Sequence, residues 1–157
     1  MEWTEGNIEG VCVTHPARYT DDRGWLSEIF RSDEMPEEIL PAMAYLSLTH
    51  AGVTRGPHAH RHQTDTFAFT GPGTFRLKLW DNRPDSPTYG NTLEITAGEN
   101  NPAVVSVPPG VVHGYCNISD GDALVYNAPN RLFAGKGKKD PVDEIRYEEN
   151  GNETFKM

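Results

Sequence analysis

The fold of this chain is decided by residues 52–65, which read GVTRGPHAHRHQTD. The stretch carries three histidines at alternate positions, His58, His60 and His62. Alternate residues of a β-strand point to the same side, so these imidazoles would share one face. Three imidazoles on one face suit the wall of a ligand cavity in a narrow barrel better than a packed core. We therefore expect a histidine-lined site at the mouth of a β-barrel.

A second stretch, residues 108–117, reads PPGVVHGYCN and contains His113. The spacing from Gly52 through the paired histidines to Asp65 resembles the first sequence motif of the cupins, with aspartate where those proteins usually have glutamate. Residues 108–117 match the second cupin motif in full. Together the two motifs predict an all-β fold, the cupin double-stranded β-helix or jelly-roll barrel, with little helix.

Short alternating runs of apolar and polar residues support the β assignment. In the clearest run, residues 74–80, Phe75, Leu77 and Leu79 share one face. One short helix is expected at residues 33–40, and turns rich in proline and glycine separate the strands. The other expected strands are residues 10–14, 25–30, 44–49, 66–70, 92–95, 103–107 and 123–126.

The 157 residues suit a single cupin domain over residues 1–157, with a polar C-terminal tail from about residue 148. We expect the end of that tail to be disordered or to pack on a partner subunit. A formal net charge of −9 argues against nucleic acid as a partner, although arginines gathered in one place would still bind a small anion. We expect no membrane span and a cytoplasmic protein, because long apolar runs and a secretory signal are missing and there are only two cysteines.

The histidine-rich stretches admit three interpretations. The first is a metal site for zinc, iron, manganese or nickel, built from His58, His60 and His113 with Asp65 or Gln63. The second is acid–base chemistry, because histidine exchanges its proton near neutral pH. The third is a solvated polar edge with one or two structural imidazoles.

Beyond the cupin motifs, the chain resembles the dTDP-4-dehydrorhamnose 3,5-epimerase family from about residue 21 to residue 147. Residues 22–28, DRGWLSE, resemble an early family segment, and residues 52–58, GVTRGPH, resemble its G-V-L-R-G-L-H motif. Residues 81–90, DNRPDSPTYG, resemble a specific D-x-R-x-x-S-P-T-F-G stretch. Residues 107–126 resemble the run that contains the second motif.

The resemblance implies an isomerase that acts on a nucleotide-linked 4-keto-6-deoxyhexose without a cofactor, in deoxysugar or cell-surface polysaccharide biosynthesis. A ketone at C4 acidifies the hydrogens at C3 and C5, so a base removes one of them and an acid returns a proton from the opposite face. His58 matches the family base, while Arg55 and His113 would support it. Arg23 and Glu28 match nucleotide-contacting residues, often across the interface of a homodimer.

The chain departs from the family in three places. Residues 64–67 lack the family lysine, and no tyrosine stands after Tyr126 where the family has its proton donor. Tyr45 and Tyr126 are the candidate replacements, and both are expected to bind substrate together with His60. The family aspartate that pairs with the histidine would lie beyond residue 147, and the candidates to replace it are Asp65 and the aspartates at positions 120 and 122, although nothing in the sequence requires a replacement.

The run His58-Ala59-His60 also resembles nucleotide-sugar 3,4-ketoisomerases, which carry a similar segment in a similar barrel. Two further functions stay open. One is a metal-dependent cupin enzyme that uses a divalent transition metal held by His58, His60, Asp65 and His113. The second is a non-catalytic cupin that binds a sugar nucleotide.

Overall fold

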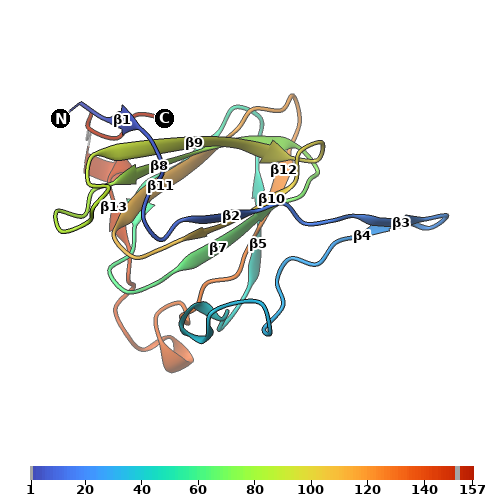
Figure 1. The fold of residues 1–157 in the computed structure, drawn as a ribbon, viewed down its shortest axis with the longest axis horizontal. Helices are drawn as coiled ribbons and strands as arrows, with labels where there is room; N and C mark the ends of the chain where they lie inside the picture. Colours follow the sequence, from blue (N-terminus) through green and yellow to red (C-terminus); the bar gives the residue numbers. More distant parts are fainter. Residues whose placement is uncertain (1, 151–152) are drawn as a thin grey trace.

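The computed structural model describes residues 2–150 and 153–157, and almost all of its regular structure is β-strand (Figure 1). No helix in this part of the chain has the length and apolar character to cross a membrane. The main strands confirm the expected all-β jelly-roll barrel. The strands are β1 (Thr4–Glu5), β2 (Cys12–Thr14), β3 (Tyr19–Asp21), β4 (Gly24–Leu26), β5 (Tyr45–Thr49), β6 (Thr54–Ala59), β7 (Asp65–Phe69), β8 (Thr74–Asp81), β9 (Asn91–Gly98), β10 (Ala103–Val107), β11 (Val111–Asn117), β12 (Ala123–Asn127) and β13 (Ile145–Arg146).

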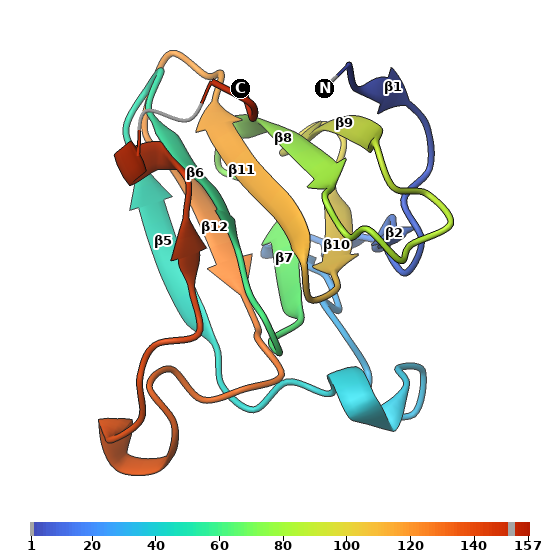
Figure 2. The same ribbon diagram turned by 90° about the vertical axis from the view of Figure 1, so that its left-hand side faces the viewer.

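Two sheets form the barrel (Figures 1 and 2). The six-stranded sheet has the order β1-β9-β8-β11-β6-β13, and the five-stranded sheet has the order β2-β10-β7-β12-β5. Neighbours in these orders are mostly distant in sequence, which is how a jelly roll closes a barrel without exposing its central strands. As a result, β6, β7 and β11, which carry the two histidine-rich motifs, lie on facing sheets around one interior.

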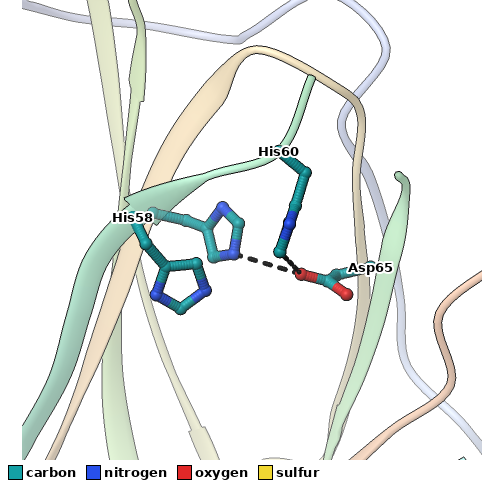
Figure 3. A group of neighbouring side chains, drawn as sticks. His58, His60 and Asp65 are labelled. Atoms are coloured by element: carbon teal, nitrogen blue, oxygen red, sulfur yellow. Dashed lines mark ion pairs between the residues drawn. The ribbon is translucent and has the colours of Figure 1, made fainter. Parts of the chain in front are cut away.

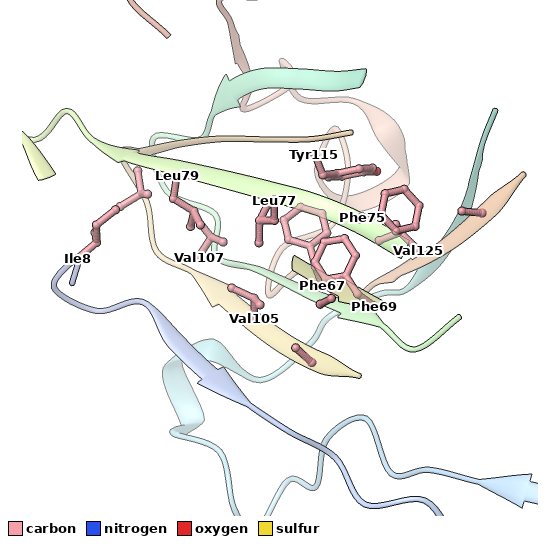
Figure 4. Close-up of a cluster of buried hydrophobic side chains, with 14 residues drawn as sticks. Ile8, Phe67, Phe69, Phe75, Leu77, Leu79, Val105, Val107, Tyr115 and Val125 are labelled. Carbon is pink, nitrogen blue, oxygen red and sulfur yellow. The ribbon is translucent and has the colours of Figure 1, made fainter. Parts of the chain in front are cut away.

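A buried apolar cluster fills part of the barrel interior (Figure 4). On β8 the predicted alternation is confirmed, because Phe75, Leu77 and Leu79 are at most 1% exposed. Facing strands contribute Phe67 and Val105. This packing occupies one part of the barrel and leaves the neighbouring part to the polar motif residues, which gives the site a rigid floor.

Two expected elements are shorter than predicted. The strand expected at residues 25–30 ends at Leu26, where β3 and β4 form a two-stranded hairpin that projects from the barrel (Figure 1). The helix expected at residues 33–40 is only a 3-10 turn, η1 (Glu37–Ile39). No residue of this turn is buried, so no packing extends it into a regular helix.

The expectation of a disordered C-terminal end is wrong for residues 153–157, because they pack on their own chain. Phe155 is 4% exposed and packs edge-on against Trp80, with ring centroids 5.7 Å apart. Trp3 and Tyr147 also pack against the ring of Phe155. These aromatic side chains cover the outer face of the six-stranded sheet, behind the strands that carry the histidines.

Candidate active site

The site is built first on the pairing of β6 with β11. His58 and His113 are partners in the antiparallel register, and their ring centroids lie 4.5 Å apart at an interplanar angle of 70°. Their neighbours Ala59 and Val112 belong to the cluster on the outer face. Because successive strand residues alternate in direction, both imidazoles point into the barrel.

A carboxylate completes the group. Asp65, the first residue of β7, is 1% exposed, and its Oδ2 lies 2.9 Å from Nε2 of His60 (Figure 3). The same oxygen lies 3.3 Å from Nε2 of His113. Asp65 therefore lies between two imidazoles, and the sequence candidates at positions 120 and 122 do not take this role. Asp122 instead pairs with His50.

Asp143 fixes the loop after β6, although the sequence did not indicate it. Its main-chain oxygen accepts a hydrogen bond from Nδ1 of His60. Its carboxylate accepts the main-chain N–H groups of Arg61, His62 and Gln63 at 2.8, 2.8 and 3.1 Å. The contact joins residues about 80 positions apart, so no local pattern could have revealed it.

The expectation that three histidines share one face is wrong for His62. Strand β6 ends at Ala59, and the chain then turns, so the alternation of a strand does not extend to position 62. The side chain of His62 is exposed, whereas His60 is 8% exposed. His62 consequently stands outside the cluster formed by His58, His60, Asp65 and His113, which we call the histidine cluster.

Burial and the neighbouring side chains shift the pKa values of the clustered groups in different directions. Desolvation, followed by the nearby His113 and His60, lowers the pKa of His58 to about 2, which keeps its imidazole neutral. Burial alone would lower the pKa of His60, but the hydrogen bond and charge of Asp65 raise it above the ordinary value. Burial acts to raise the pKa of Asp65, yet the two imidazoles beside it hold that pKa below its usual range.

His58 and His60 reach a cavity of about 1000 Å³ at the open side of the cluster, which we call the histidine cavity. Its wall gathers basic side chains, as the binding of an anion would require. Four acidic residues also line it, but Glu144 pairs with Arg146 and Asp143 is bonded to the main chain. The basic residues of the wall are Arg55, Arg131, Lys136, Lys138 and Arg146.

Tyr45 lines the same cavity and is connected to the cluster through Asn127. The Nδ2 atom of Asn127 donates to Oη of Tyr45 at 2.9 Å and to Oδ1 of Asp65 at 3.0 Å. Burial raises the pKa of Tyr45 to about 12, so its hydroxyl stays protonated. Tyr126 alternates to the other face of β12 from Asn127 and is not among the cavity residues.

Two other predicted residues, Arg23 and Glu28, lie outside the histidine cavity, whereas Gln63 is part of its wall. Arg23 pairs with Asp21 on the projecting hairpin, and its side chain is 89% exposed. Glu28 contacts Arg31 and lines a separate cavity of about 820 Å³. Gln63 lies beside the cluster and donates from Nε2 to Oδ1 of Asp65 at 2.9 Å. The structure thus does not bring Arg23, Glu28 or Tyr126 to the site. The predicted residues that it does bring together are His58, His60, His113, Asp65, Gln63, Arg55 and Tyr45.

The histidine cluster also has the composition of a metal site. Each of its four side chains offers one nitrogen or oxygen ligand atom, and these atoms all lie within 4.8 Å of one another. Three imidazoles and one carboxylate are ligands that suit zinc and neighbouring transition metals. The arrangement can therefore serve proton transfer, metal binding or both at different times.

Comparison with known proteins gives one consistent family. The family model described as dTDP-4-dehydrorhamnose 3,5-epimerase matches residues 5–140. The "Probable low-salt glycan biosynthesis epimerase Agl13" of Haloferax volcanii is 37% identical over 139 residues, which are 88% of this chain and 86% of that protein. The "Spore coat polysaccharide biosynthesis protein SpsL" of Bacillus subtilis is 38% identical over 108 residues, covering 69% of this chain and 70% of that protein.

Solved structures agree with this result. NovW of Streptomyces spheroides, described as a 4-keto-6-deoxy sugar epimerase, superposes with a TM-score of 0.75 at 27% identity, covering 93% of this chain and 73% of that one. A dTDP sugar isomerase of Desulfovibrio desulfuricans superposes with a TM-score of 0.77 at 24% identity, covering 88% and 84% of the two chains. The second likeness bears on the fold alone.

Proposed function

Because the chain belongs to the dTDP-4-dehydrorhamnose 3,5-epimerase family, we propose that it is an isomerase that epimerises a dTDP-linked 4-keto-6-deoxyhexose. The reaction would serve deoxysugar or cell-surface polysaccharide biosynthesis, as the names of its relatives suggest. The observation that carries the proposal is the imidazole of His58, the register partner of His113, on the wall of a cavity that also gathers basic side chains.

In the proposed reaction, His58 removes a hydrogen from the carbon next to the C4 ketone. A base must be unprotonated to accept a proton, and the lowered pKa of His58 keeps it so at neutral pH. Arg55, whose Nε and Nη2 atoms are held by Thr49 and the main chain of Leu48, lines the same cavity and would stabilise the enolate oxygen. His113, paired with His58, would hold the orientation of the base.

Tyr45 is the best placed group to return the proton. Its oxygen already accepts a hydrogen bond from Asn127, which leaves the hydroxyl hydrogen available to a ligand. It lines the histidine cavity, whereas Tyr126 does not. This assignment supplies the acid that the sequence lacked at the family position.

We assign the nucleotide to the basic wall of the cavity and to a second subunit. Exposed apolar side chains occur on the projecting hairpin, where Trp25 is 50% and Leu26 is 63% exposed, and on the edge strand β5, where Leu46 is 68% exposed. Such exposure is typical of a subunit contact. A cytoplasmic homodimer formed there would bring Arg23 and Glu28 near the nucleotide bound by the partner.

The experiment is solvent exchange with chelator-treated protein. Incubation of dTDP-4-keto-6-deoxyglucose in deuterium oxide should place deuterium at C3 or C5, because abstracted hydrogen is replaced from the solvent. Nuclear magnetic resonance of the product would locate the label and the inverted centre. Absence of both label and inversion in folded protein would refute the proposal.

A further inference from the structure

Where the histidine cavity meets the buried apolar cluster, its wall carries two hydroxyl groups, those of Tyr115 on β11 and Ser47 on β5. Tyr115 follows His113 by two residues, so both side chains point into the barrel. Burial raises the pKa of Tyr115, and a side-chain hydrogen bond with Ser47 acts against this rise. The phenol therefore stays protonated at neutral pH and forms a hydroxyl pair with Ser47.

The ring of Tyr115 is held in one position. It is 4% exposed and packs edge-on against Phe67, Phe69 and Phe75, with ring centroids 5.7, 5.8 and 5.5 Å apart (Figure 4). A phenol that is packed among three rings cannot turn its hydroxyl towards solvent. The position of its oxygen is thus set before a ligand enters the cavity, which favours selection of a ligand by shape and hydrogen bonding.

The pair of Ser47 and Tyr115 keeps hydrogen-bonding capacity for a ligand. Each hydroxyl can donate one hydrogen bond and can also accept, and the bond between the two uses one hydrogen. The second hydrogen and the remaining lone pairs are left over. A sugar hydroxyl both donates and accepts, so it matches the pair. A ligand with only hydrogen at that position would leave the pair unsatisfied in a site closed to water, which costs free energy.

The pair lies beside Arg55, which the proposed reaction uses at the enolate oxygen. Tyr115 and Arg55 are register partners on β11 and β6. Nε of Arg55 donates to Thr49, which shares a face of β5 with Ser47 because the two are two residues apart. A hexose whose C4 oxygen lies at Arg55 would therefore bring another substituent of its ring to the pair.

We propose that Ser47 and Tyr115 bind the C2 hydroxyl of the hexose and make the enzyme specific for sugars that carry it. The inference rests on the proposed function, because the chemistry of that substrate selects the position. A 4-keto-6-deoxyhexose bound to the nucleotide through C1 has ring hydroxyls at C2 and C3. C3 and C5 are the carbons whose configuration can change, so the C2 hydroxyl is the one that stays in place during the reaction. A rigid pair suits a hydroxyl that does not move.

The test compares dTDP-4-keto-6-deoxyglucose with its 2-deoxy counterpart in the deuterium-exchange assay. Wild-type protein should favour the substrate with the hydroxyl by at least about 100-fold in kcat/KM. Tyr115→Phe and Ser47→Ala should each reduce this preference at least about tenfold, because they slow exchange of the hydroxylated substrate and not of its 2-deoxy counterpart. Tyr126→Phe, outside the cavity, should keep the wild-type preference.

Circular dichroism checks that each variant is folded. Ser47 is only half-buried, so Ser47→Ala keeps the test valid if Tyr115→Phe does not fold. Equal kcat/KM values for the two substrates in wild type would overturn the proposal. An equal loss on both substrates in Tyr115→Phe and Ser47→Ala would also overturn it, since that is the result of a merely structural role.

A binding measurement separates this inference from the proposed function. If wild-type protein exchanges neither substrate, the proposed function fails, and calorimetry with dTDP-6-deoxyglucose and its 2-deoxy counterpart tests the pair. A Kd at least about tenfold weaker for the 2-deoxy compound in wild type, but not in Tyr115→Phe, would support recognition of the hydroxyl. Equal Kd values in wild type, or no binding of either compound, would overturn it.

Discussion

His58 and His113 are register partners on β6 and β11, with ring centroids 4.5 Å apart. Two imidazoles at this distance in a buried site cannot both carry a positive charge without strong repulsion. The pairing therefore helps to keep His58 neutral and fixes its direction towards the histidine cavity. Two motifs that are distant in the sequence thus place one imidazole as the proposed proton acceptor.

Replacement of Tyr45 by phenylalanine should separate exchange from inversion. His58 would still remove the hydrogen and return deuterium to the same face, while the opposite face would receive no proton. We expect deuterium uptake within several-fold of wild type and inversion reduced at least about 100-fold. Tyr126→Phe is the matched comparison and should change neither measurement. Inversion at the wild-type rate in Tyr45→Phe would remove Tyr45 as the proton donor.

The carboxylate of Asp81 should make stability depend on pH. It accepts hydrogen bonds from Arg83, Ser86 and Thr88. Burial acts to raise the pKa of Asp81, but these bonds hold it well below the ordinary value. A carboxyl whose pKa is lowered on folding stabilises the protein above the unfolded pKa, and this stabilisation is lost as the pH falls through the folded pKa.

Asp81→Asn should therefore reduce the free energy of unfolding by about 1–3 kcal/mol at pH 7. The difference from wild type should shrink as the pH falls below about 4, since protonation weakens the same interactions in wild type. Denaturant titrations at several pH values measure both effects. Asp21→Asn, at an exposed ion pair on the hairpin, is the control and should leave stability unchanged. A difference at Asp81 that is constant with pH would contradict this role of the carboxylate.

Phe155→Ala should destabilise the protein although it lies close to the C-terminal end of the chain. The ring is 4% exposed and packs on Trp80, so truncation leaves a cavity behind the six-stranded sheet. We expect a loss of about 3–5 kcal/mol in the free energy of unfolding. Val142→Ala, at an exposed position, is the comparison. Equal stability of both variants would mean that the C-terminal contacts contribute little.

Leu26→Asp should weaken the proposed homodimer, because a charge on the projecting hairpin would be buried at the subunit contact. Sedimentation at several protein concentrations should show a higher dimer dissociation constant than wild type. Val142→Asp, also at an exposed apolar position, should leave the dissociation constant unchanged. A wild-type protein that is monomeric throughout would refute the proposed dimer.

The sequence predicted the barrel and the cluster because both depend on short patterns. Alternation identified β8, and motif spacing identified His58, His60 and His113 with Asp65. Contacts between residues that are distant in the sequence could not be predicted from such short patterns. Asp143 joins the cluster across about 80 residues, and Asn127 connects it to Tyr45 through side-chain geometry alone.

Two errors have physical causes of the same kind. The polar C-terminal segment looked unable to pack, but one aromatic ring, Phe155, anchors it on Trp80. The alternation that placed His62 with the other histidines assumed that the strand continued, whereas β6 ends at Ala59. In the first case the local pattern could not predict a tertiary contact, and in the second it could not predict where the strand ends.

The most direct test of the proposed mechanism is deuterium exchange by His58→Asn in the presence of chelator. Asparagine keeps a polar side chain of similar reach but cannot act as the base, so uptake at C3 or C5 of dTDP-4-keto-6-deoxyglucose should fall by about 100-fold to 10,000-fold. His50→Asn, at an exposed imidazole paired with Asp122, should exchange at the wild-type rate. Exchange by folded His58→Asn at the wild-type rate would contradict the assignment of His58 as the base.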